Sequence, residues 1–263
     1  EYAQTALTLG QLEQARGSVN RALEYAEQAI KVLEARNATE LATANLRQML
    51  AELYRLRGEN LFLMGRYESA LPEFTRAQEI LTKLVEEFPL DIQRQIDLAC
   101  VQCVLAEIRA GRGETDEASA LIDSTAATVN RFVSRTDRNA EWSELAANVL
   151  SSRAVVSLYR GEWSAAGEAA SAYHAKVKSA AGIDPENVLA QTSLAGSYWL
   201  MGRVLSAQGQ HQAALVDFDN GLAVVDRLLT VDPDISMWRQ QQSMLRIHKG
   251  LALLALGRPE ASA

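Results

Sequence analysis

The sequence is poor in cysteine, in aromatic residues and in long apolar runs. Two cysteines among 263 residues cannot form the disulfide framework that stabilises many small secreted domains. The longest apolar run covers residues 251–256, far fewer than the roughly 20 residues that a membrane-spanning helix needs. Lys and Arg number 26 against 33 Asp and Glu, and the net charge of −7 argues against a nucleic-acid-binding surface. With 48% hydrophobic residues, the chain still has enough apolar side chains for a core.

Glycine is scarce as well, with 15 residues, but six of them recur at a constant interval of 48. These six are Gly17, Gly65, Gly113, Gly161, Gly209 and Gly257. Seven residues before each of them lies a Gly or an Ala, namely Gly10, Gly58, Ala106, Ala154, Gly202 and Gly250. Five residues after the first five of them lies an alanine, namely Ala22, Ala70, Ala118, Ala166 and Ala214. The sequence is therefore an internal repeat with a period of 48 residues.

Each repeat unit reads as a pair of helices. The sequence between the glycines is rich in Ala, Leu, Glu, Gln and Arg, which are strong helix formers, and its apolar residues recur three and four positions apart. The glycine column marks the end of the first helix, and Pro89, Pro185 and Pro233 mark the end of the second. The predicted units are 1–42 (partial), 43–90, 91–138, 139–186, 187–234 and 235–263 (partial). Because the terminal units are partial and the chain begins at Glu1 without Met, we expect a fragment or a processed product.

These columns resemble the tetratricopeptide repeat (TPR), whose units have 34 residues. With Gly58 at the eighth TPR position, Ala70 falls at the twentieth and Phe74 at the twenty-fourth, where the family has Ala and a large apolar residue. Gly202, Ala214 and Phe218 match in the same way. Each helix here is seven residues longer than in the family, which is close to two turns and keeps the buried face aligned.

The resemblance implies an all-α fold, a right-handed superhelical solenoid of stacked antiparallel helix hairpins with about five and a half TPR-like units. It covers the whole chain, so we expect a single solenoid domain over residues 1–263. Asp232-Pro233 followed by Trp238, together with Gly209, also resembles the long-helix arrays of bacterial multidomain signalling proteins.

The sequence shows little catalytic or metal-binding chemistry. Cys100 and Cys103 share a helix face, but they lie about ten residues into their helix and no further cysteine completes a zinc site. Two small buried fillers are the favoured interpretation, and a redox pair is the alternative. His174, His211 and His248 are isolated, and the sequence contains no nucleophile elbow, phosphate loop or HExxH motif. We therefore predict no enzyme activity, no cofactor and no metal.

The resemblance implies a ligand groove lined by the first helix of each repeat, at TPR positions 2, 5, 9, 12 and 13. The candidates carried over to this chain are Glu52, Arg55, Glu59, Phe62, Glu107, Ser151, Tyr159, Trp199, Arg203, Met244 and Ile247. The same positions also hold Cys100, Cys103, Ala110, Asn148, Val155, Gly196, Ser206, Leu251 and Leu254. Trp199 beside Arg203 is the strongest candidate anchor, because Trp and Arg dominate binding hot spots. The alternative is that Trp199 packs on a neighbouring helix and Arg203 pairs with an acidic residue.

We predict a scaffold that binds a protein or peptide segment in this groove, as part of a larger bacterial signalling protein. One alternative is a regulatory arm of a signalling enzyme that senses a peptide or ligand. Another is a structural spacer that self-associates through its apolar C-terminal repeat. Neither a nucleic acid nor a membrane span is expected. Reduced thiols favour the cytoplasm, with an extracytoplasmic sensor region as the alternative.

Overall fold

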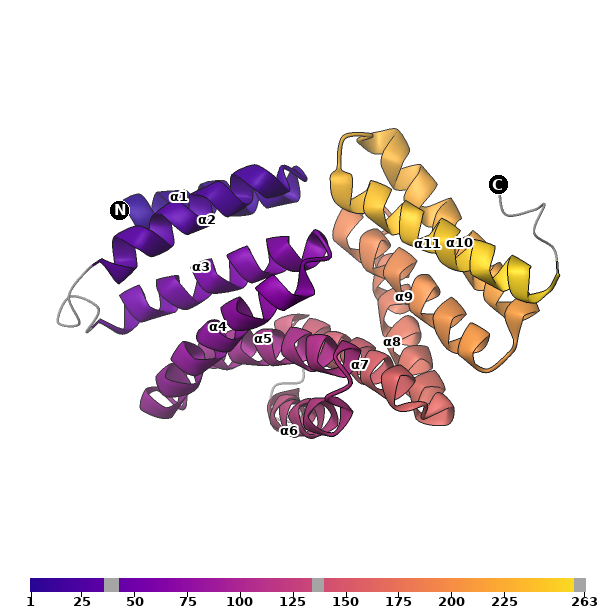
Figure 1. The fold of residues 1–263 in the computed structure, drawn as a ribbon, viewed down its shortest axis with the longest axis horizontal. Helices are drawn as coiled ribbons and strands as arrows, with labels where there is room; N and C mark the ends of the chain where they lie inside the picture. The colour runs from indigo at the N-terminus through magenta and orange to yellow at the C-terminus, as the bar shows by residue number, and fades with distance from the viewer. Residues whose placement is uncertain (36–42, 134–139, 258–263) are drawn as a thin grey trace. The chain divides into compact units, whose positions relative to one another are not determined.

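The computed structural model is all-α, and it describes residues 1–35, 43–133 and 140–257. Among these residues there is no strand (Figure 1). The helices are α1 (Tyr2–Ala15), α2 (Val19–Glu34), α3 (Ala44–Leu63), α4 (Tyr67–Glu87), α5 (Ile92–Gly111), α6 (Thr115–Val133), α7 (Ala140–Arg160), α8 (Trp163–Ile183), α9 (Val188–Ala207), α10 (His211–Val231) and α11 (Ser236–Ala255). Odd-numbered helices are the first helices of the repeat units, and even-numbered helices are the second ones.

The glycine column ends every first helix, as the sequence predicts. All six glycines have φ between 69° and 86°, a left-handed conformation that side chains disfavour. After α3, the N–H of Gly65 donates to the Phe62 carbonyl at 2.9 Å and the N–H of Arg66 donates to the Leu61 carbonyl at 2.9 Å. This pair of bonds is the Schellman motif, which satisfies the last carbonyls of a helix. The same pair occurs at Gly17, Gly113, Gly161 and Gly209.

The chain divides into two compact units, each described here by itself. Unit 1 comprises residues 1–108 and 127–145, and unit 2 comprises residues 109–126 and 146–263. In unit 1, α1 packs on α2, α2 on α3, α3 on α4, and α1 also contacts α3. In unit 2, α8 packs on α9, α9 on α10 and α10 on α11, and α9 also contacts α11. Each first helix in these sets therefore lies against the next first helix.

The small-residue columns lie where helices pack closely within each compact unit. Ala22, Ala70, Ala118, Ala166 and Ala214 are all 0% exposed. Gly58 lies against the buried ring of Phe74, and a methyl group added at Gly58 would lie 3.0 Å from Cε2 of that ring. Gly202 lies against Phe218 in the same way. Glycine at this column therefore lets the second helix place a phenyl ring directly on the first helix, as the repeat pattern predicts.

Candidate functional site

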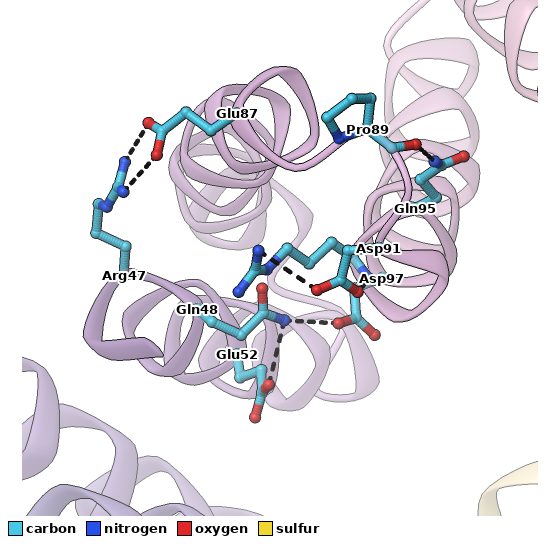
Figure 2. Close-up of polar contacts among 9 residues, drawn as sticks. Arg47, Gln48, Glu52, Glu87, Pro89, Asp91, Gln95 and Asp97 are labelled. Carbon is cyan, nitrogen blue, oxygen red and sulfur yellow. Dashed lines mark hydrogen bonds and ion pairs between the residues drawn. The ribbon is translucent and has the colours of Figure 1, made fainter. Parts of the chain in front are cut away.

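In unit 1 the adjacent first helices α3 and α5 share a polar surface. We define this polar surface as Gln48, Glu52, Arg55, Glu59 and Asp97. The side-chain Nε2 of Gln48 lies 2.6 Å from Oδ2 of Asp97 and 3.3 Å from Oε1 of Glu52 (Figure 2). Figure 2 shows Gln48 on one helix reaching across to the carboxylate of Asp97 on the other. One amide thus bridges two carboxylates and joins the two helices.

The charges of the polar surface are only partly compensated. Arg55 donates to Oε1 of Glu59 at 2.5 Å, and Gln14 of α1 donates to Oε2 of the same carboxylate at 3.2 Å. Burial raises the pKa of Glu52 and of Asp97 above their ordinary values. The Glu59 carboxylate raises the pKa of Arg55. The surface therefore holds three carboxylates and one guanidinium in a partly desolvated setting.

Two contacts at the ends of α3 and α5 hold the polar surface in place. Arg47 donates from Nη1 and Nη2 to both carboxylate oxygens of Glu87 on α4, at 2.6 and 2.7 Å (Figure 2). Gln95, near the start of α5, donates to the Pro89 carbonyl at 2.5 Å. A bidentate Arg–carboxylate pair fixes orientation as well as distance, so α3 is tied to its own second helix.

Cys100 lies near this surface, and Cys103 follows it one turn later on α5. Neither cysteine is in a disulfide, and burial raises the pKa of Cys100 to about 11. A thiol with this pKa is almost wholly protonated at neutral pH, whereas redox thiols need a lowered pKa. Cys103 is buried. The geometry therefore favours the small-filler interpretation. In the part of the chain that the structure describes, no cluster of three or more His, Cys, Asp or Glu could hold a metal ion.

In unit 2 the corresponding surface is aromatic. The guanidinium of Arg203 lies 4.6 Å from the ring centre of Trp199, a cation–π distance. His248 of α11 lies edge-on to Trp199 with ring centres 5.6 Å apart, and it stacks on Phe218 at 6.1 Å. Burial lowers the pKa of His248 to about 4, so this imidazole is neutral at pH 7. Trp199 thus packs against a neighbouring first helix, as in the alternative interpretation, while Arg203 covers its ring. The role of the pair as a ligand anchor stays a prediction.

The link between adjacent first helices recurs in unit 2 with neutral groups. Gln241 of α11 donates to the Thr192 carbonyl of α9 at 3.2 Å. Trp238 of α11 donates from Nε1 to Oγ1 of Thr192 at 3.0 Å. Thr192 and Gln241 lie three repeats after Gln48 and Asp97. The same two repeat positions therefore join first helices in both units.

The predicted groove residues divide between the two units. Unit 1 brings Glu52, Arg55 and Glu59 together, and it also holds the half-buried Phe62 and Glu107. Phe62 packs edge-on against Tyr67 at 5.0 Å. Unit 2 holds Ser151, Tyr159, Trp199, Arg203, Met244 and Ile247. The predicted set lacks Gln48, Asp97 and His248. Gln48 and Asp97 are one repeat plus one residue apart, and this spacing is a usable signal for residues on adjacent first helices.

Within the described residues, no helix has both the length and the apolar character to cross a bilayer.

Comparison with known proteins supports the fold. No protein-family model matches the sequence, and no curated protein does. Among solved structures, the apo form of RapI superposes with a TM-score of 0.60 at 12% identity, covering 99% of this chain and 85% of RapI. BtubC (BKLC) from P. vanneervenii gives a TM-score of 0.55 at 17% identity, covering 86% of this chain and 80% of BtubC.

The nearly identical TPR-like repeats of a Podosopora anserina protein assigned as a kinesin light chain, solved as a point variant, give a TM-score of 0.51 at 17% identity. That match covers 88% of this chain and 99% of the other. The chain therefore has a TPR-like helical-repeat solenoid fold, as the sequence predicts, and at these identities the likeness concerns the fold alone.

Proposed function

We propose that this chain is a scaffold module that binds a peptide or protein segment on the exposed surfaces of its first helices. The binding residues in the proposal are the predicted groove positions, with Arg55 central in unit 1 and the Trp199–Arg203 pair central in unit 2. In this proposal all 48-residue units belong to one solenoid domain over residues 1–263. The resemblance of Asp232-Pro233 and Trp238 to signalling arrays supports a role for the module within a larger bacterial signalling protein.

One observation carries the proposal. Some positions of the 48-residue repeat hold the same residue in every repeat, whereas others hold a different residue each time. The column of five alanines, Ala22 to Ala214, is invariant and 0% exposed, which is expected where helices pack closely. In successive repeats, the fifth TPR position holds Arg55, Cys103, Ser151, Trp199 and Ile247. Packing does not impose one chemistry at this position. Variation on a regular scaffold is what a recognition surface needs, since function resides in sites built on a fold.

Panning a random peptide library on the full 263-residue chain tests the proposal. We expect selected peptides to lose at least about tenfold in affinity with Arg55→Gln or Arg203→Glu, because hot-spot contacts contribute about 2 kcal/mol or more, roughly thirtyfold. Arg227→Glu is the matched control, since Arg227 is an exposed cation on the second helix α10. Circular dichroism checks that each variant keeps its helices. Selected peptides that bind every variant as tightly as the parent chain would reject the proposed surfaces.

A further inference from the structure

Two turns of unit 2 expose apolar side chains next to acidic ones. They join α8 to α9 and α10 to α11, and they lie one repeat apart. Ile183 and Val231, at equivalent positions, are 83% and 74% exposed, and Leu189 is 75% exposed. Each turn contains an Asp-Pro step followed by a second acidic residue. We define the turn edge as the exposed residues Ile183, Asp184, Glu186, Leu189, Val231 and Asp232.

The two turns lie side by side and are fixed in shape. Trp238, at the start of α11, donates from Nε1 to Oγ1 of Thr192, near the start of α9, at 3.0 Å. The carboxylates of Asp184 and Asp232 each accept a hydrogen bond from the backbone N–H two residues later, at 3.2 and 2.9 Å. The turn edge is therefore a preformed surface, which loses little conformational freedom when a partner binds.

The corresponding turn of unit 1, between α4 and α5, is covered by a side chain of its own. The guanidinium of Arg94 lies 4.2 Å from the centre of the Phe88 ring. Nη1 of Arg94 also lies 3.3 Å from Oδ2 of Asp91. One cation thus covers an apolar side chain and neutralises a carboxylate at once. Two and three repeats later, the position of Arg94 holds Ala190 and Trp238, so both turns of unit 2 lack this cation.

Charge around the turn edge restricts what can cover it. Within the described residues, none of the three carboxylates of the turn edge forms an ion pair. Asp234, which follows in the second turn, is paired, because Arg239 lies 3.1 Å from its carboxylate. Arg227 lies one helical turn before Val231, and carboxylates still outnumber cations around the two turns. A surface with this excess of negative charge favours a cationic partner.

We propose that the turn edge docks a protein segment that carries apolar side chains beside Lys or Arg. The apolar side chains of this segment cover Ile183, Leu189 and Val231. Its cations do for the turns of unit 2 what Arg94 does for the turn of unit 1. The turn edge is separate from the first-helix surfaces, so the inference goes beyond the proposed function. A nucleic acid or an anionic membrane would bring like charge to this surface.

A designed peptide tests the inference. The labelled lysine peptide has about 14 residues, four helical turns, with leucines seven residues apart and lysines beside them. Seven residues span about 10 Å of helix, which matches the roughly 8–10 Å between packed helices. One matched peptide has glutamates for the lysines, and another has serines for the leucines. In fluorescence anisotropy with the full 263-residue chain, we expect the lysine peptide to bind at least about tenfold more tightly than either.

Three variants locate the binding site. Leu189→Ser and Glu186→Lys should each weaken the lysine peptide at least about fivefold, since one removes an apolar contact and the other repels the lysines. Ala190→Arg should weaken it as well, because an arginine there would cover the turn as Arg94 does in unit 1. Leu90→Ser is the matched control, since Leu90 is 91% exposed in the turn that already has its arginine. Circular dichroism checks that each variant keeps its helices.

Ile183→Ser replaces Leu189→Ser if that variant unfolds. The inference is overturned if the lysine peptide binds no better than either matched peptide, or if Leu90→Ser weakens it as much as Leu189→Ser does. Dimers that Glu186→Lys abolishes in sedimentation velocity would also overturn it, since a second copy would then cover the turn edge. Arg203→Glu should not weaken the lysine peptide. If library peptides bind and the lysine peptide does not, only this inference falls, and the reverse result rejects only the proposed function.

Discussion

Units 1 and 2 build their first-helix surfaces at the same repeat positions with different chemistry. In unit 1, Gln48 bridges to the Asp97 carboxylate, so the joint between first helices includes a partly desolvated charge. In unit 2 the equivalent Thr192 and Gln241 are joined by one neutral hydrogen bond, from the Gln241 amide to the Thr192 carbonyl. Both compact units have the same arrangement of helices, but the side chains that join their first helices differ. The repeat therefore specifies where helices meet and leaves the electrostatic character of each surface free to differ.

The contrast extends to the contact between a first helix and its own second helix. In unit 1, Arg57 of α3 donates from Nε to Oε2 of Glu73 on α4 at 2.7 Å, and both side chains are largely buried. Three repeats later the same positions hold Met201 and Asp217. Asp217 therefore has a carboxylate without the guanidinium that its counterpart has. The two carboxylates occupy equivalent places, yet they should contribute to stability with opposite signs.

The largest expected effect is the loss of stability on Glu73→Ala. The side chain of Arg57 is only 17% exposed, so removing Glu73 leaves a largely buried cation without its carboxylate. Breaking a buried ion pair in this way costs about 3 kcal/mol. Asp217→Ala is the matched variant, and it should change the free energy of unfolding far less. Urea denaturation followed by circular dichroism measures both. Equal losses in the two variants would refute the contrast between the units.

A second difference concerns the glycines that receive the phenyl rings. A methyl group added at Gly202 would lie 2.4 Å from Cε1 of Phe218, whereas at Gly58 the nearest atom of Phe74 is 3.0 Å away. Both rings are 0% exposed and have little room to move. We expect Gly202→Ala to cost about 2 kcal/mol through overpacking. Gly58→Ala should come close to neutral, since alanine's helix propensity, about 1 kcal/mol better than that of glycine, offsets the smaller clash.

Gly182→Ala is the control for helix propensity alone. Gly182 lies near the end of α8, and an added methyl group would meet nothing within 4 Å. This variant should be neutral or slightly stabilising in the same urea experiment. If Gly202→Ala matched Gly182→Ala, the close approach of Phe218 would place no restriction on this position.

The sequence predicts those parts of the fold in which one backbone or packing requirement recurs. Gly65 and its equivalents are predictable because the left-handed turn after each first helix strongly favours glycine. Ala70 is predictable because its column is fully buried between closely packed helices, where small side chains recur. Such requirements repeat with every unit, so the period itself reveals them. The TPR-like fold could therefore be predicted before any side-chain contact was known.

The polar contacts of the site could not be predicted in the same way. Which polar residues pair depends on the rotation of neighbouring helices. The spacing of one repeat plus one residue brings Gln48 and Asp97 to adjacent first helices, but it does not specify that their side chains pair. The sequence suggests Trp199 as an exposed anchor, but helix α11 of the next repeat places His248 against its ring. Side chains from a neighbouring repeat thus decide how much of a groove residue is exposed. The binding roles of Trp199 and Arg203 stay predictions.

The smallest expected effect is a gain in stability on Asp217→Asn. Burial raises the pKa of Asp217, although Lys178 acts in the opposite direction. The folded state therefore favours the protonated carboxyl. The stability that this protonated carboxyl contributes is fully present below the pKa that Asp217 has in the unfolded chain. It is lost as the pH rises through the pKa of Asp217 in the folded chain. At about pH 7, Asn should be more stable than Asp by roughly 0.5 kcal/mol or less, because water still screens this half-buried group.

Thermal unfolding of the parent chain and Asp217→Asn, at about pH 7 and about pH 3, measures this gain. The gain should disappear at the lower pH, where the parent carboxyl is also uncharged. Acidification also protonates His174 and His248, whose pKa values burial lowers, but this cost falls on both proteins and cancels in the difference. A variant less stable than the parent at about pH 7 would mean that Asp217, like Glu73, has a favourable partner, and the two units would then share one electrostatic design.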